Sequence, residues 1–245
     1  MAKLNPVFSG IKVEEGIDNV ASFKGVTAKT ALLLGVAVLS AFLSITVGAG
    51  YIYDNPFTLF IVAIGAVICG IAGQVSANAA KLCSILYAVF EGVLLGLVSF
   101  AFDAAFSGIV MTAVLITATL FGVMLLLYST NIIKVNGTFL RAMTTIGITI
   151  FAISLIYFIS FIIDRNNILI SALVANPGLV LLIEGFILLY GAFMLAFDFE
   201  QVNIFVANGF DKRYEWMASL GLMVTLIWIY IKVLRILAIL MSRKD

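Results

Sequence analysis

Hydrophobic and polar positions divide the chain into long apolar runs that are separated by short polar breaks. A helix needs about 20 apolar residues to cross roughly 30 Å of hydrocarbon. Seven runs reach that length, at about 30–52, 57–77, 83–103, 106–129, 139–163, 177–198 and 215–241. The pattern predicts an all-α membrane protein, a seven-transmembrane-helix bundle over 30–241. A polar N-terminal tail at 1–29 and a short C-terminal tail at 242–245 flank this bundle.

The break between the third and fourth runs is the weakest one. It consists of Phe106, Ser107 and Gly108 and contains little polarity. A chain with six spans and one long hairpin is therefore the alternative count.

Composition supports a membrane protein and excludes several classes of function. The 245 residues are 63% hydrophobic and 11% charged, with a mean hydropathy of +1.20, whereas soluble domains are about 25% charged. The formal net charge of +1 gives no basic excess for nucleic acid. Histidine is absent, which removes the commonest metal ligand. Cys69 and Cys83 lie in or beside apolar runs and are interpreted as inert buried thiols.

The distribution of lysine and arginine predicts the orientation, because cytoplasmic loops carry an excess of these residues. With the N-terminus inside, nine basic residues lie on the inner side: Lys3, Lys12, Lys24, Lys29, Lys81, Lys134, Arg141, Lys212 and Arg213. The outer side carries Arg165, Arg243 and Lys244. We therefore expect a cytoplasmic N-terminus and a C-terminus outside.

Charged residues within or beside the spans need partners or a wet cavity, because each costs at least about 2.5–3.5 kcal/mol on insertion scales. These residues are Glu91, Glu184, Asp198, Glu200, Lys232 and Arg235. Glu184 lies at a depth below the outer boundary similar to that of Lys232 and Arg235. We therefore expect Glu184 to pair with one of these two basic groups. Snorkelling of both basic side chains to the interface is the alternative.

Two interpretations remain open for Glu91 and two for Asp198, which has Glu200 nearby. Glu91 is either a protonated side chain bonded to a neighbouring helix carbonyl or a carboxylate that lines a wet path. Asp198 and Glu200 are two positions apart, so they point to different faces of a helix. Glu184 and Asp198 lie close to one face, which favours the wall of a pathway. A solvated helix end at Asp198 is the alternative.

Two glycines, Gly92 and Gly96, lie four positions apart in the third run. Small residues at that spacing let transmembrane helices approach closely, so we interpret this pair as a packing feature.

Catalysis is not indicated by the sequence. There is no histidine, no Cys/His pair, no phosphate-binding glycine loop and no dense polar cluster to hold a reacting group. We expect no enzyme activity, no catalytic residue and no cofactor.

Several motifs run in order along nearly the whole chain. They are NPVF at 5–8, VTAKTALLL at 26–34, LYAVFEGVLLG at 86–96, IIKVNGTFLRA at 132–142, FDFEQV at 197–202 and SLGLMVTLIWIYIKVLRILAIL at 219–240. Together they resemble the Bax inhibitor-1 family, and in particular its bacterial YccA-like branch.

The resemblance implies six helices around a central seventh, a weak calcium leak and a cytoprotective role in stress, in a bacterial cytoplasmic (inner) membrane. In the family's leak members, two aspartates on the last two helices form a pH-sensitive latch. Asp198 matches the first aspartate, but Thr225 stands at the second position. Arg235 matches a family basic residue, whereas the basic residue at the end of the second span is missing, with Gln74 and Asn78 nearby.

Two functions remain open at this point. The first is a low-affinity calcium or cation leak, with Asp198, Glu200 and Glu91 as candidates for the path. Calcium usually takes six to eight oxygen ligands, so only transient Ca²⁺ binding is expected, without a metal site. The alternative, which the YccA-like branch implies, is a regulatory protein whose tail binds and restrains a membrane-bound protease without transporting ions.

Overall fold

The computed structural model describes residues 20–48, 56–163 and 176–242. Within them, seven helices are long and apolar enough to cross a membrane. They are α1 (Phe23–Leu43), α3 (Pro56–Val75), α4 (Ala77–Ala105), α5 (Ile109–Ser129), α6 (Gly137–Ile163), α8 (Pro177–Ala207) and α9 (Arg213–Met241). A π-helical segment, η2 (Ser44–Gly48), continues α1. The seven-span prediction is confirmed.

A tight turn separates α4 from α5 and makes the six-span alternative wrong. Gly108 adopts a φ of 80°, in the left-handed region that glycine enters without a steric penalty. The backbone N–H of Gly108 donates a hydrogen bond to Asp103 Oδ1 over 3.0 Å. The glycine and the carboxylate allow the chain to reverse with few polar residues.

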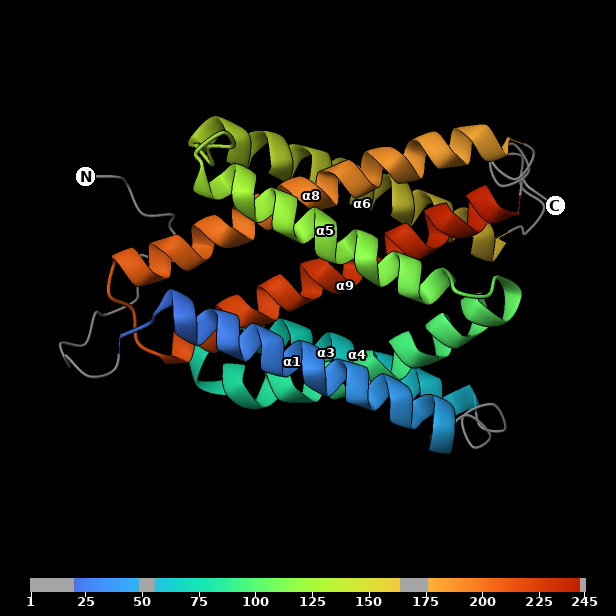
Figure 1. The fold of residues 1–245 in the computed structure, drawn as a ribbon, viewed down its shortest axis with the longest axis horizontal. Coiled ribbons are helices and arrows are strands. Elements are labelled where there is room, and N and C mark those ends of the chain that lie inside the picture. Colours follow the sequence, from blue (N-terminus) through green and yellow to red (C-terminus); the bar gives the residue numbers. More distant parts are fainter. Residues whose placement is uncertain (1–19, 49–55, 164–175, 243–245) are drawn as a thin grey trace.

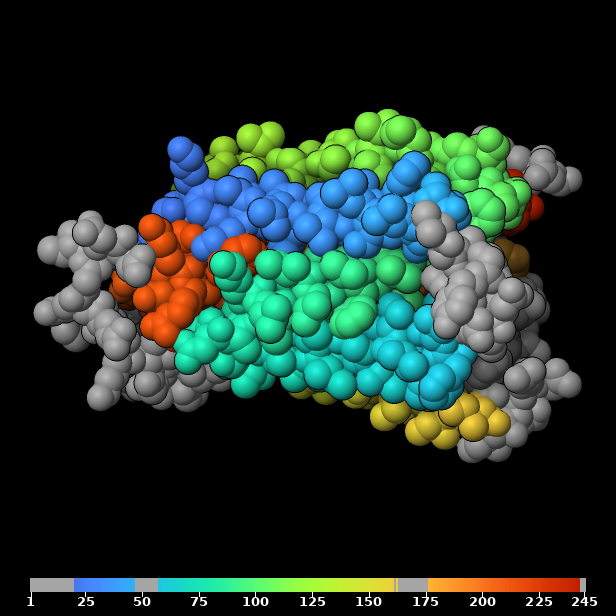
Figure 2. All heavy atoms as spheres, turned by 90° about the horizontal axis from the view of Figure 1, so that it is seen from below, coloured from blue at the N-terminus to red at the C-terminus, as the bar shows by residue number. Residues whose placement is uncertain are grey.

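Helix α9 lies at the centre of the bundle (Figure 1). It runs between a layer of α1, α3 and α4 and a layer of α5, α6 and α8. It contacts α1, α3, α4, α5 and α8, and α6 packs against α8. In the space-filling view, α1, α4 and α3 lie side by side and cover one face (Figure 2). The predicted central position of the last helix is therefore confirmed.

The central position of α9 follows from apolar residues on more than one of its faces. Leu220, Met223 and Ile227 are buried in one hydrophobic cluster with residues of α1, α3 and α4. On another side, Leu222 and Ile229 are buried in a second cluster that includes residues of α5 and α8. Because residues on more than one face of α9 are buried against other helices, α9 packs between the two groups of helices.

Helices α1 and α4 approach each other at the two glycines of α4. A Cβ atom at Gly92 would overlap the carbonyl oxygen of Ala37, and one at Gly96 would overlap the carbonyl oxygen of Ala41. Both obstacles are backbone atoms of α1, which cannot move aside as a flexible side chain does. The predicted packing role of the glycine pair is confirmed.

Several predicted boundaries differ from those of the structure, including the start of α4, which lies at Ala77 instead of 83. Helix α8 continues to Ala207 instead of ending near 198, because Phe199, Val202 and Phe205 carry its buried face onward at helical spacing. Asp198 therefore lies inside a helix and not at a solvated end.

Helix α1 begins at Phe23, within the predicted tail. The Ser22 side chain caps this helix by accepting a hydrogen bond from the Gly25 N–H over 3.0 Å.

We refer below to the end of the bundle where α8 ends and α9 begins as the turn end. The end where α9 finishes is the C-terminal end. In Figure 1 the turn end lies on the left and the C-terminal end on the right.

Replacing Gly92 with leucine should weaken the bundle, because the new side chain meets the α1 backbone. We expect the free energy of unfolding to fall by at least about 1–3 kcal/mol, the usual cost of overpacking. Reversible denaturation of the purified protein in mixed micelles measures it. The control is Gly122→Leu on α5, where nothing lies within 4 Å of the added Cβ. Equal stability of the two variants would contradict the close α1–α4 approach.

Candidate functional site

Asp198 lies on α8 and faces the central helix α9. The Thr225 hydroxyl on α9 donates a hydrogen bond to its carboxylate. The other oxygen, Oδ2, has almost no exposed surface and no hydrogen-bond partner among the described residues. Burial of an unpaired polar oxygen costs free energy, and more when the group is charged. Asp198 is therefore a carboxylate whose second oxygen is left for a proton or a cation.

A glycine on α9 brings a third helix to this position. A Cβ on Gly221 would lie 3.3 Å from Nε2 of Gln74 on α3 and 3.9 Å from Oδ1 of Asp198. Because Gly221 has no side chain, the amide of Gln74 and the carboxylate approach the same small space. Gln74, Asp198, Gly221 and Thr225 form a cluster that we call the Asp198 cluster.

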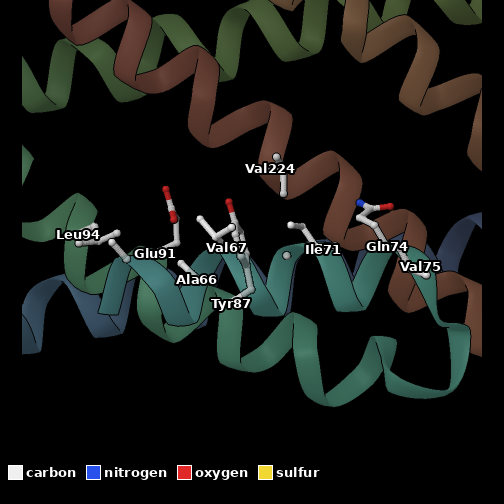
Figure 3. A pocket seen from close by; sticks show the side chains of 11 residues that line it. Ala66, Val67, Ile71, Gln74, Val75, Tyr87, Glu91, Leu94 and Val224 are labelled. Atoms are coloured by element: carbon white, nitrogen blue, oxygen red, sulfur yellow. The ribbon is translucent and has the colours of Figure 1, made fainter. Parts of the chain in front are cut away.

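An apolar groove extends from Gln74 along α3, α4 and α9. Its volume is about 530 Å³. Residues of α3 and α4 form most of its wall, and Val224 contributes from α9. The side chains of Gln74, Tyr87 and Glu91 point from α3 and α4 toward the space in front of α9 (Figure 3). Three polar groups therefore enter a groove that is otherwise apolar.

Glu91 is the central residue of the 29-residue helix α4. At 1.5 Å per residue it lies about 21 Å from either end of that helix, near the middle of a bilayer. Its carboxylate takes part in no hydrogen bond or ion pair with the residues that the structure describes. The carboxylate lines the groove.

Glu200 faces a different helix from Asp198. It accepts a hydrogen bond of 2.7 Å from the Tyr128 hydroxyl of α5. Phe199, which lies between the two acids, packs against Phe121 and Tyr128. The two carboxylates thus point to separate faces, as their spacing indicates, and the structure does not bring Glu200 to the groove.

At the C-terminal end, Glu184 contacts both basic residues of α9. Its Oε2 accepts a hydrogen bond from Lys232 Nζ at 3.0 Å, and its Oε1 lies 3.0 Å from Arg235 Nη1. The side chain of Glu184 is 5% exposed and that of Lys232 is 16% exposed, while that of Arg235 is 57% exposed. Both of the ion pairs that the sequence offered as alternatives are formed. They join α8 to α9 within the apolar region.

At the turn end, Glu215 forms a buried cluster that the sequence analysis missed. Its carboxylate accepts the backbone N–H of Ser22 at 2.8 Å and the Ser22 hydroxyl at 3.1 Å, and it pairs with Lys29. Glu215 is 2% exposed, and its carboxylate occupies the space where a Cβ on Gly25 would lie. This cluster joins the start of α1 to the start of α9.

The same end holds the short turn between α8 and α9. The backbone N–H of Ala21 donates to the carbonyl of Phe210 at 2.7 Å, and Val20 forms an antiparallel bridge with Asp211. A hydrogen bond from the Arg213 backbone N–H, followed by contacts with the Arg213 side chain, lowers the pKa of Asp211. The turn is therefore fixed to the residues that precede α1.

The described residues contain no group of three or more histidine, cysteine, aspartate or glutamate side chains that could hold a metal ion. The Asp198 cluster offers the oxygens of one carboxylate and one hydroxyl, whereas the Gln74 atom nearest to Gly221 is the amide nitrogen Nε2. Calcium usually takes six to eight oxygen ligands. The oxygens of the Asp198 cluster fall short of that number.

A family model described as "Bax inhibitor 1 like" matches residues 5–242. The chain belongs to the Bax inhibitor 1 like family. No curated protein and no solved structure matched the chain.

Membership of the Bax inhibitor 1 like family agrees with the multi-pass architecture of this chain. In this family member, the residue of α9 that hydrogen-bonds Asp198 is Thr225. A threonine hydroxyl holds the contact between α8 and α9 without a second titrating group. Gln74 lies where α3 reaches the same space, so a neutral amide faces Asp198 from that side.

Reversing the charge of Glu184 should destabilise this Bax inhibitor 1 like protein. A lysine at 184 would face Lys232 and Arg235, so we expect Glu184→Lys to lower the free energy of unfolding by about 3–5 kcal/mol, as for other broken buried pairs. Adding Lys232→Glu should recover part of this loss. Arg235→Gln should cost less than Lys232→Gln, because Arg235 is more exposed. The same micelle denaturation measures all of these variants, and a double variant no more stable than Glu184→Lys would argue against the pairing.

Proposed function

We propose that this protein is a low-affinity cation leak pathway, with Ca²⁺ as the expected ion and a cytoprotective role in stress. The observation that carries the proposal is the unpartnered Oδ2 of Asp198, buried beside the end of the groove. No catalytic step is assigned to the chain.

The route runs past the groove from Glu91, near mid-membrane, to the Asp198 cluster toward the turn end. Each carboxylate lowers the free energy of a cation in a region of low dielectric constant. Neither is surrounded by enough oxygen ligands to retain the ion. A pathway conducts when binding is favourable enough for entry and weak enough for release, and two separated single carboxylates meet both conditions.

The proposed location is a bacterial inner membrane with the N-terminus in the cytoplasm. Support comes from the basic residues that the helices gather at the turn end. Lys29, Lys212 and Arg213 lie there beside the starts of α1 and α9. Such an excess of basic residues is typical of the cytoplasmic side.

Calcium flux into proteoliposomes tests the proposal. Asp198→Asn keeps the shape of the side chain and removes its charge, so we expect a clear loss of flux. Gly221→Leu should also reduce flux, because its side chain would fill the space between Gln74 and Asp198. The flexible end of Gln74 can yield, so this variant should still fold. Gly122→Leu is the matched control and should conduct as the native protein does. Unchanged flux in Asp198→Asn would remove this residue from the path.

The second candidate is a regulatory role in which the tail binds and restrains a membrane-bound protease. One observation favours it. Val20 and Ala21 are bound to the turn before α9, and Ser22 is bound to Glu215. A partner that pulls on the tail would therefore act directly on the start of the central helix.

Removing residues 2–19 separates the two candidates, because it leaves the Ser22 cap and the Glu215 cluster intact. If the leak is the function, calcium flux should persist in the truncated protein. If restraint of a protease is the function, co-purification with a membrane protease should be lost together with the tail. A truncated protein that still binds such a protease would contradict the second candidate.

A further inference from the structure

The groove between α3, α4 and α9 combines an apolar wall with one charged group. Of the eleven residues that line it, Glu91 alone carries a formal charge. The remaining lining is apolar, apart from the Tyr87 hydroxyl and the Gln74 amide. Ligand sites typically have volumes of about 300–1,000 Å³ and a few polar groups on apolar walls. A volume of about 530 Å³ lies within that range.

The groove opens to the lipid-facing surface of the bundle. Val67, Ile71 and Val75 line it from α3, and each is at least 60% exposed. In a bilayer these side chains contact hydrocarbon. A ligand with an apolar chain can therefore enter from the membrane without crossing water.

The charge of the groove selects the head group of that ligand. The carboxylate of Glu91 has no hydrogen bond or ion pair with the described residues, and it points into the groove (Figure 3). An acidic head group, such as that of a fatty acid, would be repelled. A neutral chain would leave the carboxylate unpaired, at a cost in the apolar region. A protonated amine both pairs the charge and donates hydrogen bonds.

We propose that this groove is a binding site for an amphiphilic amine, with its ammonium group on Glu91 and its apolar chain along α3 toward the bilayer. Tyr87 lies one helical turn from Glu91 on α4 and provides a further hydrogen-bonding group beside the head group, whereas Gln74 lies at the other end of the groove (Figure 3). The ligand would lie across the proposed cation route, so it would block the leak. This blocking effect rests on the proposed function, whereas the binding itself does not.

Binding of radiolabelled dodecylamine to the protein in nanodiscs tests the site, with empty nanodiscs subtracted. Dodecylamine is protonated at neutral pH, as lysine is, and dodecanol serves as the neutral probe of matched length. We expect saturable binding of the amine at least about tenfold tighter than that of the alcohol, because a charge-assisted hydrogen bond contributes that much. Equal affinities would overturn the proposal and indicate a lipid chain as the occupant.

Two variants locate the site independently. Glu91→Gln preserves the shape of the side chain, and it should weaken amine binding about tenfold or more. Val67→Trp should fill the groove without changing any charge, and it should also weaken binding. Leu115→Trp is the control for the second variant, because Leu115 is an exposed apolar residue of α5 outside the groove. Native affinity in Glu91→Gln, or in Val67→Trp, would overturn the proposed site.

Calcium flux distinguishes failure of this site from failure of the proposed function. Dodecylamine should inhibit flux in native proteoliposomes and have much less effect in Val67→Trp, which fills the groove and leaves both carboxylates of the route unchanged. A native protein that binds dodecylamine through Glu91 but shows no calcium flux would keep the site and reject the leak. A native protein that conducts calcium without Glu91-dependent amine binding would keep the leak and reject the site.

Discussion

Two buried carboxylates, one at each end of the central helix α9, form ion pairs that connect α9 to its neighbours and hold it in place. Glu215 pairs with Lys29 at the turn end, and Glu184 pairs with Lys232 and Arg235 at the C-terminal end. An unpaired charge in an apolar environment costs several kcal/mol, so each pair must keep its partners close. The pairs join α9 to α1 at one end and to α8 at the other. The apolar packing of the remaining helices is arranged around this axis.

Asp198 lies between these two paired ends and differs from them in one respect. The Thr225 hydroxyl donates a hydrogen bond to the Asp198 carboxylate, whereas Oδ2 of that carboxylate has no hydrogen-bond partner among the described residues. The structural carboxylates are neutralised by basic groups, whereas Asp198 and Glu91 are reached by no ammonium or guanidinium group within the described ranges. Both unpaired acids lie at or near one groove. This difference in pairing separates the groups that hold the fold from those that we assign to function.

The sequence predicted the spans and the ion pairs of Glu184, because long apolar runs and similar depths are readable from spacing alone. It placed the end of α8 too early, although Phe199, Val202 and Phe205 continue the helical period of buried residues beyond Asp198. Glu215 was missed because it follows Lys212 and Arg213 and looks like a solvated residue. The groove and the role of Gly221 depend on how three helices meet, which no local pattern contains.

The most direct test measures calcium flux against pH for the native protein and for Thr225→Asp. It asks whether Asp198 is the single titrating group at the contact between α8 and α9. Two facing carboxylates share a proton, because both cannot ionise cheaply, and they therefore titrate as a coupled pair. We predict that flux through Thr225→Asp changes over a wider pH range than flux through the native protein, in which Asp198 titrates alone, and that adding Asp198→Asn restores a single transition. Identical pH profiles for the native protein and Thr225→Asp would contradict a functional contact between these two positions.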